Sequence, residues 1–388
     1  MRRHLYDADH QAFREVVAEF VKREVVPHLN RWDEQRFIDR DTWIAAGKQG
    51  IVGLAAPENY GGGGGTDYRF RAVVMEEFAK VHATALSSSF SLQDDIAIPY
   101  IKELGNQDQL ARWMPSMATG ELIGAIAMTE PGTGSDLKGI RTSATKVAGG
   151  WLVNGSKTLI TNGIQSDIVI TVARTDPEGG VNGFSLLVVE RDMPGFIRGR
   201  KLQKIGLHAQ DTAELVYEDV FVPEANVLGR IGSGFGQLKA KLPLERLSIA
   251  VHALAVAESI LRETITYVRD RTAFGQRIAD FQNTQFELAE IQTEVNIGGN
   301  FVDQAILALN AVDLVDVDVD VDAAQAKWWS ADLQNRVIDR CLQLRGGYGF
   351  MIEYPVARAY QDARIQRIFD GTNEIMKQII GRSLVGPA

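Results

Sequence analysis

Cysteine is nearly absent from this chain, which has one, Cys341, among 388 residues. A single thiol can form neither an internal disulfide nor a cysteine metal cage, and it suits a reducing compartment, so we expect the cytoplasm. The six histidines include no H-E-x-x-H or other metal-ligand spacing. The sequence therefore predicts no metal site.

Long hydrophobic runs and an excess of positive charge are also missing. No stretch approaches the ~18 uninterrupted apolar residues of a membrane helix, and Met1–His10 has no apolar segment of a signal peptide behind it. The net charge of −9 argues against a nucleic-acid partner, which would require a clustered basic surface. The length instead predicts a globular chain of two or three packed subdomains with no membrane segment.

The first third of the sequence has helical periodicity. The five consecutive glycines of Gly61–Gly65 predict a loop between helices, and a phosphate-binding role is disfavoured because no strand leads into it. Similar helical patterns occupy Arg71–Ala79 and Gln107–Met117. The first apolar helical face is formed by Phe13, Val16, Val17, Phe20 and Val21.

From about Leu122 the periodicity changes to that of strands. Runs rich in β-branched residues predict strands at Ser166–Ala173, Phe184–Val189 and Ala213–Val222. Asn154-Gly155, between Trp151–Val153 and Lys157–Ile160, predicts a hairpin turn because Asn-Gly supplies the positive φ angles that such a turn requires.

Helical periodicity returns at Gln237 and continues to the end of the chain. Val312–Asp322 alternates valine and aspartate. A two-faced strand is possible there, but an acidic loop between helices is favoured because aspartate is a poor helix former. A Rossmann fold is disfavoured, since no βαβ units occur and Gly232–Gly236 lacks the G-x-G-x-x-G spacing. The order of helices, strands and helices predicts an α+β fold that is mainly α.

Four polar or glycine-rich segments are candidates for chemistry. Met128–Asp136 lies where helices give way to strands, and its glycines allow close approach of a ligand. Asp270–Gly275 ends a long helix with a cation, an aromatic ring and a glycine, which suits a phosphate. Arg345–Gly349 is glycine-rich between helices. Ile368–Glu374 places a carboxylate beside a helix N-cap signal, and alone it would read as a capped helix start.

Together these segments resemble the acyl-CoA dehydrogenase family over essentially the full length. The T-E-P-G-T-G-S-D, R-x-x-F-G, G-G-x-G-[FY] and G-T-N-E-I stretches occur in family order, and Gly206–Leu215 and Leu242–Leu247 are most similar to the long-chain type. The resemblance implies an N-terminal helical domain (1–120), a central β-barrel-like domain (121–228) and a C-terminal four-helix bundle (229–388). It also implies FAD, an acyl-CoA substrate of fatty acid β-oxidation, an electron-transfer flavoprotein as acceptor and a homotetramer.

The same resemblance assigns site residues. Along the flavin edge and face it places Ile126, Met128, Thr129, Gly134, Ser135, Leu159, Ile160 and Thr161, with Ser135 also near the thioester and with Leu159 where many relatives carry an aromatic residue. Further FAD contacts, in part across a subunit interface, would come from Arg271, Phe274, Gln282, Gln343, Leu344, Gly346, Gly347, Thr372, Asn373 and Glu374. Substrate contacts would come from Arg246 and Gly371.

Two positions match family positions for the catalytic base, Glu245 and Asp370. In the family a carboxylate removes the α-proton of the thioester while the β-hydrogen leaves as hydride, and the resemblance places the backbone N–H of Asp370 as a donor to the thioester carbonyl. Asp370 is one methylene shorter than the glutamate of most relatives, so reach favours Glu245. Without the resemblance, Glu245 would be interpreted as an ion-pair partner on an amphipathic helix.

Three other functions fit parts of the pattern. A nitroalkane-oxidising flavoprotein of the same superfamily would use Asp370 as base. A dehydrogenase could also act on an acyl group bound to a carrier protein. A non-catalytic, DNA-binding relative would require a basic C-terminal extension, and this chain ends at Ala388 without one.

Overall fold

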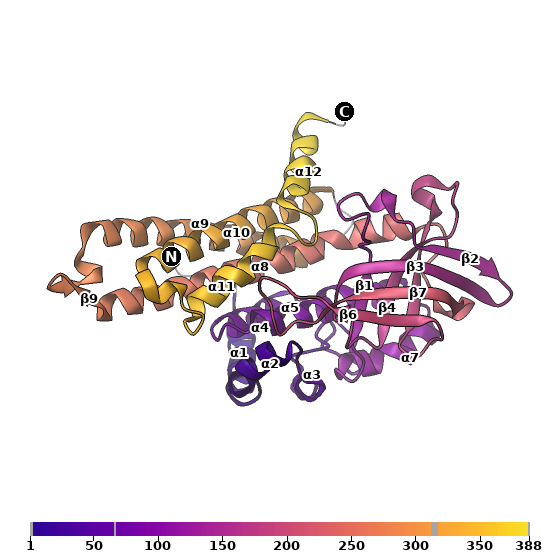
Figure 1. Cartoon of the computed structure of the whole chain (residues 1–388), viewed down its shortest axis with the longest axis horizontal. Helices are drawn as coiled ribbons and strands as arrows, with labels where there is room; N and C mark the ends of the chain where they lie inside the picture. The colour runs from indigo at the N-terminus through magenta and orange to yellow at the C-terminus, as the bar shows by residue number, and fades with distance from the viewer. Residues whose placement is uncertain (1–2, 66, 312–316, 387–388) are drawn as a thin grey trace.

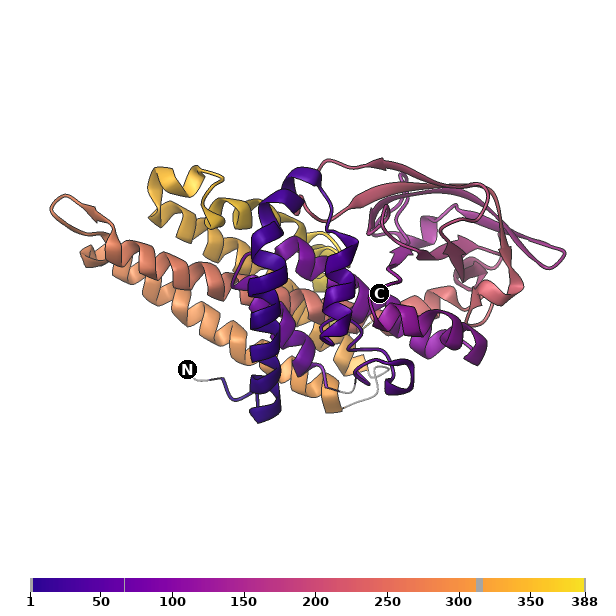
Figure 2. The same ribbon diagram turned by 90° about the horizontal axis from the view of Figure 1, so that it is seen from below.

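The computed structural model describes residues 3–65, 67–311 and 317–386, and it has the predicted order of helices, sheet and helices (Figure 1). The sheet lies at one end of the molecule and the long C-terminal helices at the other. The N-terminal helices cross beside both, as the view from below shows (Figure 2). The α+β, mainly α fold class is therefore confirmed.

The N-terminal region is helical throughout. Helix α1 (Ala8–Phe20) begins at the Asp7 side chain, which accepts hydrogen bonds from the backbone N–H groups of Asp9 and His10. Its predicted apolar face is correct at Val17 and Phe20, which are buried. The glycine run Gly61–Gly65 is a loop, as predicted. The other elements are η1 (Val21–Val25), η2 (Val26–His28), α2 (Leu29–Gln35), α3 (Arg40–Lys48), η3 (Glu58–Tyr60), α4 (Arg69–Ala79), α5 (Thr84–Ser91), η4 (Leu92–Ala97), α6 (Ile98–Leu104) and α7 (Gln107–Ala118).

The middle of the chain forms one eight-stranded sheet with the order β6-β7-β3-β2-β4-β5-β8, and β1 pairs in parallel with β4. β4 and β5 are antiparallel and buried on both faces, which explains their nearly continuous apolar sequences. The elements are β1 (Gly124–Ala127), η5 (Leu137–Gly139), β2 (Ser143–Val147), β3 (Gly150–Thr161), β4 (Ile168–Arg174), η6 (Gly180–Gly183), β5 (Phe184–Glu190), β6 (Phe196–Lys201), β7 (Thr212–Pro223), η7 (Glu224–Asn226) and β8 (Val227–Leu228).

The predicted hairpin at Asn154-Gly155 is wrong. Both residues lie inside the single strand β3, at a register shift against β7, and the turn instead precedes β3 at Gly149, where φ is +78°. Gly155 has φ +145°, and a Cβ there would lie 2.6 Å from Thr142 Oγ1. The Asn-Gly pair therefore serves a bulge and a close strand approach rather than a turn.

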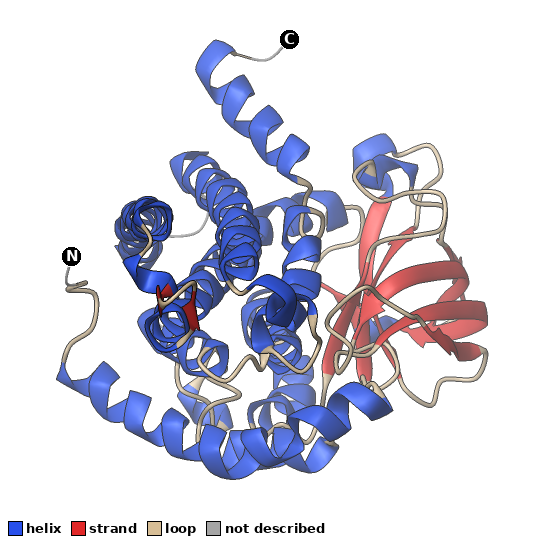
Figure 3. Ribbon diagram, turned by 60° about the vertical axis from the view of Figure 1, so that its left-hand side comes forward, coloured by secondary structure: helices blue, strands red, loops and turns tan. Residues whose placement is uncertain are grey.

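The C-terminal region consists of long helices packed on one another. α8 (Gly234–Asp270) runs along α10 (Val317–Leu344), with α9 (Gln282–Ala311) beside them, and α12 (Asn373–Val385) projects from the body at its C-terminal end (Figure 3). The remaining elements are β9 (Thr272–Ala273), β10 (Gln276–Arg277), η8 (Ile278–Asp280), η9 (Gly346–Phe350), α11 (Pro355–Ala363) and η10 (Arg364–Arg367). None of the described helices is long and apolar enough to cross a membrane.

The loop predicted over Val312–Asp322 is wrong for its second part. Residues 312–316 lie outside the described residues, but α10 already begins at Val317. Val319 is buried and Asp320 forms an ion pair with Arg246 of α8. Contacts between the two helices thus outweigh the poor helix propensity of aspartate.

Candidate active site

Two carboxylates come together where α8 faces the turn before α12. Glu245, about three turns into α8, is completely buried, and Asp370 lies in the turn. Burial raises the pKa of Glu245 well above its ordinary range, and the negative charge of Asp370 raises it further. Burial also raises the pKa of Asp370, although the cations Lys327 and Arg246 oppose that increase. The two groups therefore titrate as one coupled pair.

Glu245 is held by a hydrogen bond rather than by an ion pair. Tyr100, buried on α6, donates its hydroxyl to Glu245 Oε1 at 3.1 Å. Burial and the charge of Glu245 raise the pKa of Tyr100, which keeps the phenol protonated as a donor. Glu245 Oε2 is buried and has no hydrogen-bond partner among the described residues. The ion pair on an amphipathic helix that is expected without the resemblance is thus wrong, and Oε2 of the carboxylate remains free to accept a proton.

The turn that carries Asp370 has an unusual backbone. Asp370 and Gly371 both have positive φ, +50° and +94°, and only glycine adopts such values readily. The backbone N–H of Asp370 has no hydrogen-bond acceptor within the described chain. Lys327 of α10 donates from Nζ to the carbonyl of Gly371 at 2.6 Å, and Thr372 caps α12 by accepting from the N–H of Ile375 at 3.3 Å. A strained turn with an unused N–H therefore faces the buried glutamate.

The other predicted residues near this turn have structural partners. Arg246 is buried and its guanidinium forms an ion pair with Asp320. Asn373 is buried and donates to Asp332 Oδ1 at 3.0 Å, while Glu374 is exposed in the first turn of α12. These contacts fix the start of α12 against α10.

The predicted flavin-edge residues form a second group at the ends of β1 and β3. The N–H of Thr158 donates to the carbonyl of Thr129 at 3.0 Å, which joins the two segments. Buried Lys157 extends that junction by donating to the carbonyl of Met128 at 3.0 Å and to Glu130 at 2.9 Å. Ile126 and Ile160 are buried beneath the junction, whereas Met128, Thr129 and Thr161 are half-buried and Gly134 and Ser135 are exposed.

Leu159 is the most conspicuous residue of that group. A second register shift in β3, between Lys157 and Ile160, gives Leu159 a φ of +62° and leaves 62% of it exposed. A bulky residue in the left-handed region on the surface is unfavourable both for the backbone and for hydration. This arrangement leaves the apolar side chain of Leu159 on the surface, where it can pack against a bound molecule.

A third group lies at the far end of α8, around a pocket of about 550 Å³. Arg271, just past the end of α8, lines it with its guanidinium 5.4 Å from the centre of the Tyr348 ring. The predicted FAD residues Gln343, Leu344, Gly346 and Gly347 line the same pocket. Phe274 is 96% exposed in the β9–β10 turn, and Gln282 begins α9 nearby.

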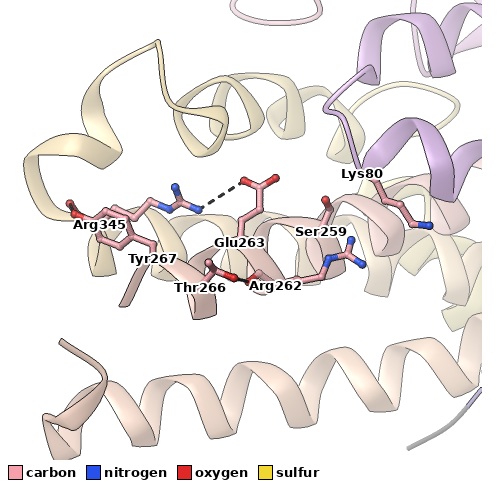
Figure 4. A pocket seen from close by; sticks show the side chains of 7 residues that line it. All are labelled: Lys80, Ser259, Arg262, Glu263, Thr266, Tyr267 and Arg345. Carbon is pink, nitrogen blue, oxygen red and sulfur yellow. Dashed lines mark hydrogen bonds and ion pairs between the residues drawn. The ribbon is translucent and has the colours of Figure 1, made fainter. Parts of the chain in front are cut away.

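A neighbouring pocket of about 570 Å³ shares Tyr267 and Arg345 with the first (Figure 4). The buried Arg345 side chain points toward Glu263, with 3.7 Å between Nη2 and Oε2. Lys80 lines its opposite side. Of the candidate segments named from the sequence, only Arg345–Gly349 reaches this pocket, through Arg345, which lines both cavities.

The structure therefore brings the predicted residues into three groups rather than one. Glu245 and Arg271 are both fixed to α8 but 26 residues apart, which corresponds to roughly 39 Å along the helix. Sequence reasoning missed Tyr100 and Lys327, which contact the carboxylate pair and its turn. The one signal for Lys327 is a lone cation on an otherwise apolar stretch of helix, and Tyr100 has none.

Comparison with known proteins identifies the class. The chain matches the models of the N-terminal, middle and C-terminal domains of acyl-CoA dehydrogenases over residues 7–121, 125–220 and 232–385. It therefore belongs to the acyl-CoA dehydrogenase family and is an oxidoreductase, which confirms the resemblance seen in the sequence.

Among individual proteins, the long-chain specific acyl-CoA dehydrogenase of Sus scrofa mitochondria is 46% identical, over 99% of this chain and 88% of the relative. A solved acyl-CoA dehydrogenase from Geobacillus kaustophilus has a TM-score of 0.95 and 44% identity, covering 99% of this chain and all of the other. An acyl-CoA dehydrogenase from Bacillus anthracis, complexed with FAD, has a TM-score of 0.93 and 29% identity over 98% of this chain and 68% of the other.

Proposed function

We propose that this protein dehydrogenates a long-chain acyl-CoA thioester between its α and β carbons, giving the trans-2-enoyl-CoA, with FAD as cofactor. The observation that carries the proposal is the carboxylate pair, in which the buried Glu245 faces a turn whose Asp370 N–H has no acceptor among the described residues. A buried base and a free backbone donor are the two elements that enolate-like chemistry requires. The long-chain specific relatives support the substrate class.

Glu245 is the proposed base. Its free Oε2 takes the α-proton, and the electron pair of the broken C–H bond becomes part of the new double bond. The backbone N–H of Asp370 donates to the thioester carbonyl oxygen as negative charge develops there. Tyr100 and Arg246 favour the ionised form of Glu245, which burial disfavours, and so they keep an ionised base available. Asp370 is the alternative base, because its carboxyl belongs to the same coupled pair.

The exposed groups of this chain fit FAD. Leu159 and its neighbours offer an apolar surface for a flat ring system, and Arg271 offers a cation for a phosphate beside the open glycines Gly346 and Gly347. When bound, FAD supplies the acceptor for the hydride that leaves the β carbon. The solved relative in complex with FAD supports this choice.

The separation of the two FAD groups supports an oligomer. Leu159 lies in β3, whereas Arg271 directly precedes β9, and these two strands lie at opposite ends of the molecule (Figure 1). We propose that a second copy supplies the Arg271 group to the FAD held at Leu159, within the homotetramer that the family implies. Scattering measurements of the mass with and without FAD would test this, and a flavin-loaded monomer would contradict it.

Electrons would then pass from the reduced protein to an electron-transfer flavoprotein, and we propose the cytoplasm as the compartment. The test is anaerobic titration of the flavin-loaded protein with acyl-CoAs of graded length and branching, followed by transfer to that acceptor. Flavin bleaching that is strongest with long chains is the expected result. Bleaching by a nitroalkane with oxygen as acceptor, and none by acyl-CoA, would instead favour nitroalkane oxidation by Asp370. Bleaching only by an acyl carrier protein thioester would change the substrate class.

A further inference from the structure

Lys327 is a fully buried lysine whose ammonium group contacts the backbone of the active-site turn. It lies two to three turns into α10, with none of its surface exposed. Its Nζ donates to the carbonyl of Gly371 at 2.6 Å and lies 3.4 Å from Asn373 Oδ1. A buried ammonium is costly unless its hydrogen bonds are made, so this contact fixes where both the lysine and the turn lie.

The turn needs such a contact because its backbone is strained. Asp370 adopts a φ of +50°, a region that non-glycine residues leave when nothing holds them. Gly371 follows at +94°, and a Cβ there would lie 2.6 Å from Met376 Cε. The carbonyl that Lys327 binds belongs to the residue directly after Asp370, so the hydrogen bond fixes one end of the turn. Only the φ and ψ torsions of Asp370 and Gly371 separate that fixed carbonyl from the Asp370 N–H.

Charged groups from the turn and from helices α8, α10 and α12 surround the Lys327 ammonium. Asp370 of the turn, Arg246 of α8, Glu374 of α12 and Asp332 of α10 all act on its ammonium. Burial is the largest influence and lowers the pKa of Lys327 to about 8, while the charge of Lys327 in turn lowers the pKa of Asp370. Glu245 and Tyr100 complete the group of titratable side chains that face Asp370.

We propose that Lys327 is a positioning residue for the dehydrogenation, holding the Asp370–Gly371 turn so that the Asp370 N–H points at the thioester carbonyl. The inference rests on the proposed function for its catalytic consequence. Because Lys327 acts through the turn and does not touch the substrate, its loss slows the chemical step and leaves acyl-CoA binding nearly unchanged. The loss of its charge also raises the pKa of Asp370.

The test compares full-length, flavin-loaded Lys327→Met with wild type in two measurements. The first is hydrogen exchange of the Ile375 and Met376 amides, which both bind Thr372 and report the order of the turn without any reaction. The second is the anaerobic rate of flavin reduction by a saturating acyl-CoA, measured across pH. Asn335→Ala is the matched control, since Asn335 also tethers α10 to the C-terminal segment, by donating to the carbonyl of Ala363 at 3.0 Å.

We expect both amides to exchange at least about tenfold faster in Lys327→Met. Flavin reduction should be about 10-fold to 100-fold slower, less than the loss of a direct oxyanion donor. The half-saturating acyl-CoA concentration should be unchanged, and the part of the pH profile that belongs to Asp370 should move to higher pH. Asn335→Ala should change none of these. Lys327→Gln keeps a neutral donor, so its exchange and reduction rates should lie between those of wild type and Lys327→Met. If Lys327→Met does not fold, the same two measurements on Lys327→Gln decide the proposal.

Unchanged amide exchange, or faster exchange with an unchanged reduction rate, would overturn the positioning role. A wild type that no acyl-CoA reduces would overturn the proposed function instead. The exchange measurement would still decide whether Lys327 orders the turn, because it requires no substrate.

Discussion

The two ends of α8 differ in how far the rest of the chain encloses their side chains. At Glu245 the described groups that act on its carboxylate are Tyr100 from α6, Asp370 from the turn before α12, and Lys241 and Arg246 from α8 itself. At Arg271, about 39 Å further on, the side chains are exposed around an open pocket, and Phe274 has 96% of its surface in solvent. The first end is enclosed by the chain, and the second is open to solvent.

Under the proposed function, the Glu245 end of α8 should control the reaction, and the Arg271 end should control how tightly FAD is bound. Charges buried within one chain shift the pKa values of their neighbours strongly, because no water screens them. An exposed cation contributes through direct contact with a ligand and changes little else. Variants at the first end should therefore change the rate and pH dependence of flavin reduction, and variants at the second should change FAD affinity.

The largest effect is expected for Glu245→Gln. The amide is nearly isosteric but cannot accept the α-proton, so the anaerobic flavin reduction rate should fall about 100-fold to 10,000-fold, the usual contribution of a general base. FAD and acyl-CoA binding, followed by absorbance, should be retained. Near wild-type reduction in this variant, together with an inactive Asp370→Asn, would make Asp370 the base.

Arg271→Ala should come next, with its effect confined to the cofactor. Loss of a charge-assisted hydrogen bond, worth about 1.5–3 kcal/mol, should weaken FAD binding about 10-fold to 150-fold while the helical circular dichroism stays intact. Arg269→Ala is the matched control, because Arg269 is an exposed arginine in the last turn of the same helix. Equal FAD affinity in both variants would remove Arg271 from the phosphate site.

Asp370→Asn should have a smaller effect, a decrease in reduction rate of about tenfold or less, because the backbone N–H remains. The negative charge of Asp370 raises the pKa of Glu245, so removing it should move the rise of the rate with pH to lower pH. Reduction rates from pH 6 to 9 measure this shift. A shift to higher pH would show that Asp370 does not act on Glu245 through its charge.

Tyr100→Phe should have the smallest effect and the opposite sign. Its hydrogen bond lowers the pKa of Glu245, so its loss should move the same rise to higher pH. At neutral pH the rate should fall about threefold to tenfold, the value of one neutral hydrogen bond of about 0.5–1.5 kcal/mol. The same pH series tests it, and an unchanged profile would mean that the phenol only fills space.

Sequence reasoning predicted elements whose pattern is local. The periodicity around Phe20, the strand runs of β4, β5 and β7 and the Thr372 cap all depend on neighbouring residues, and all are confirmed. The hairpin at Asn154-Gly155 was wrong because its partner, β7, lies about sixty residues away and imposes a straight strand with a bulge. The acidic loop was wrong at Asp320 because Arg246 of α8 neutralises it.

The candidate site shows the same difference between residues in local motifs and residues that act through long-range contacts. Motifs placed Glu245, Asp370 and Arg271 in the family's pattern, but the roles assigned to them remain predictions. Tyr100 and Lys327 could not be predicted, since each acts on a residue more than forty positions away and neither belongs to a motif. Their contributions depend on burial, which a single sequence does not reveal for a polar residue.

Because Glu245 and Arg271 are attached to one unbroken helix, the number of residues between them fixes both their separation and their relative direction. One inserted residue anywhere between them would rotate Arg271 by about 100° around the axis relative to Glu245 and move it about 1.5 Å. The proposed base and the proposed phosphate-binding arginine would then no longer face the directions that the proposed oligomer requires. In the proposed oligomer the length of this segment is therefore a geometric constraint on the assembly, and point substitutions on its surface should be tolerated far better than a change in length by a single residue.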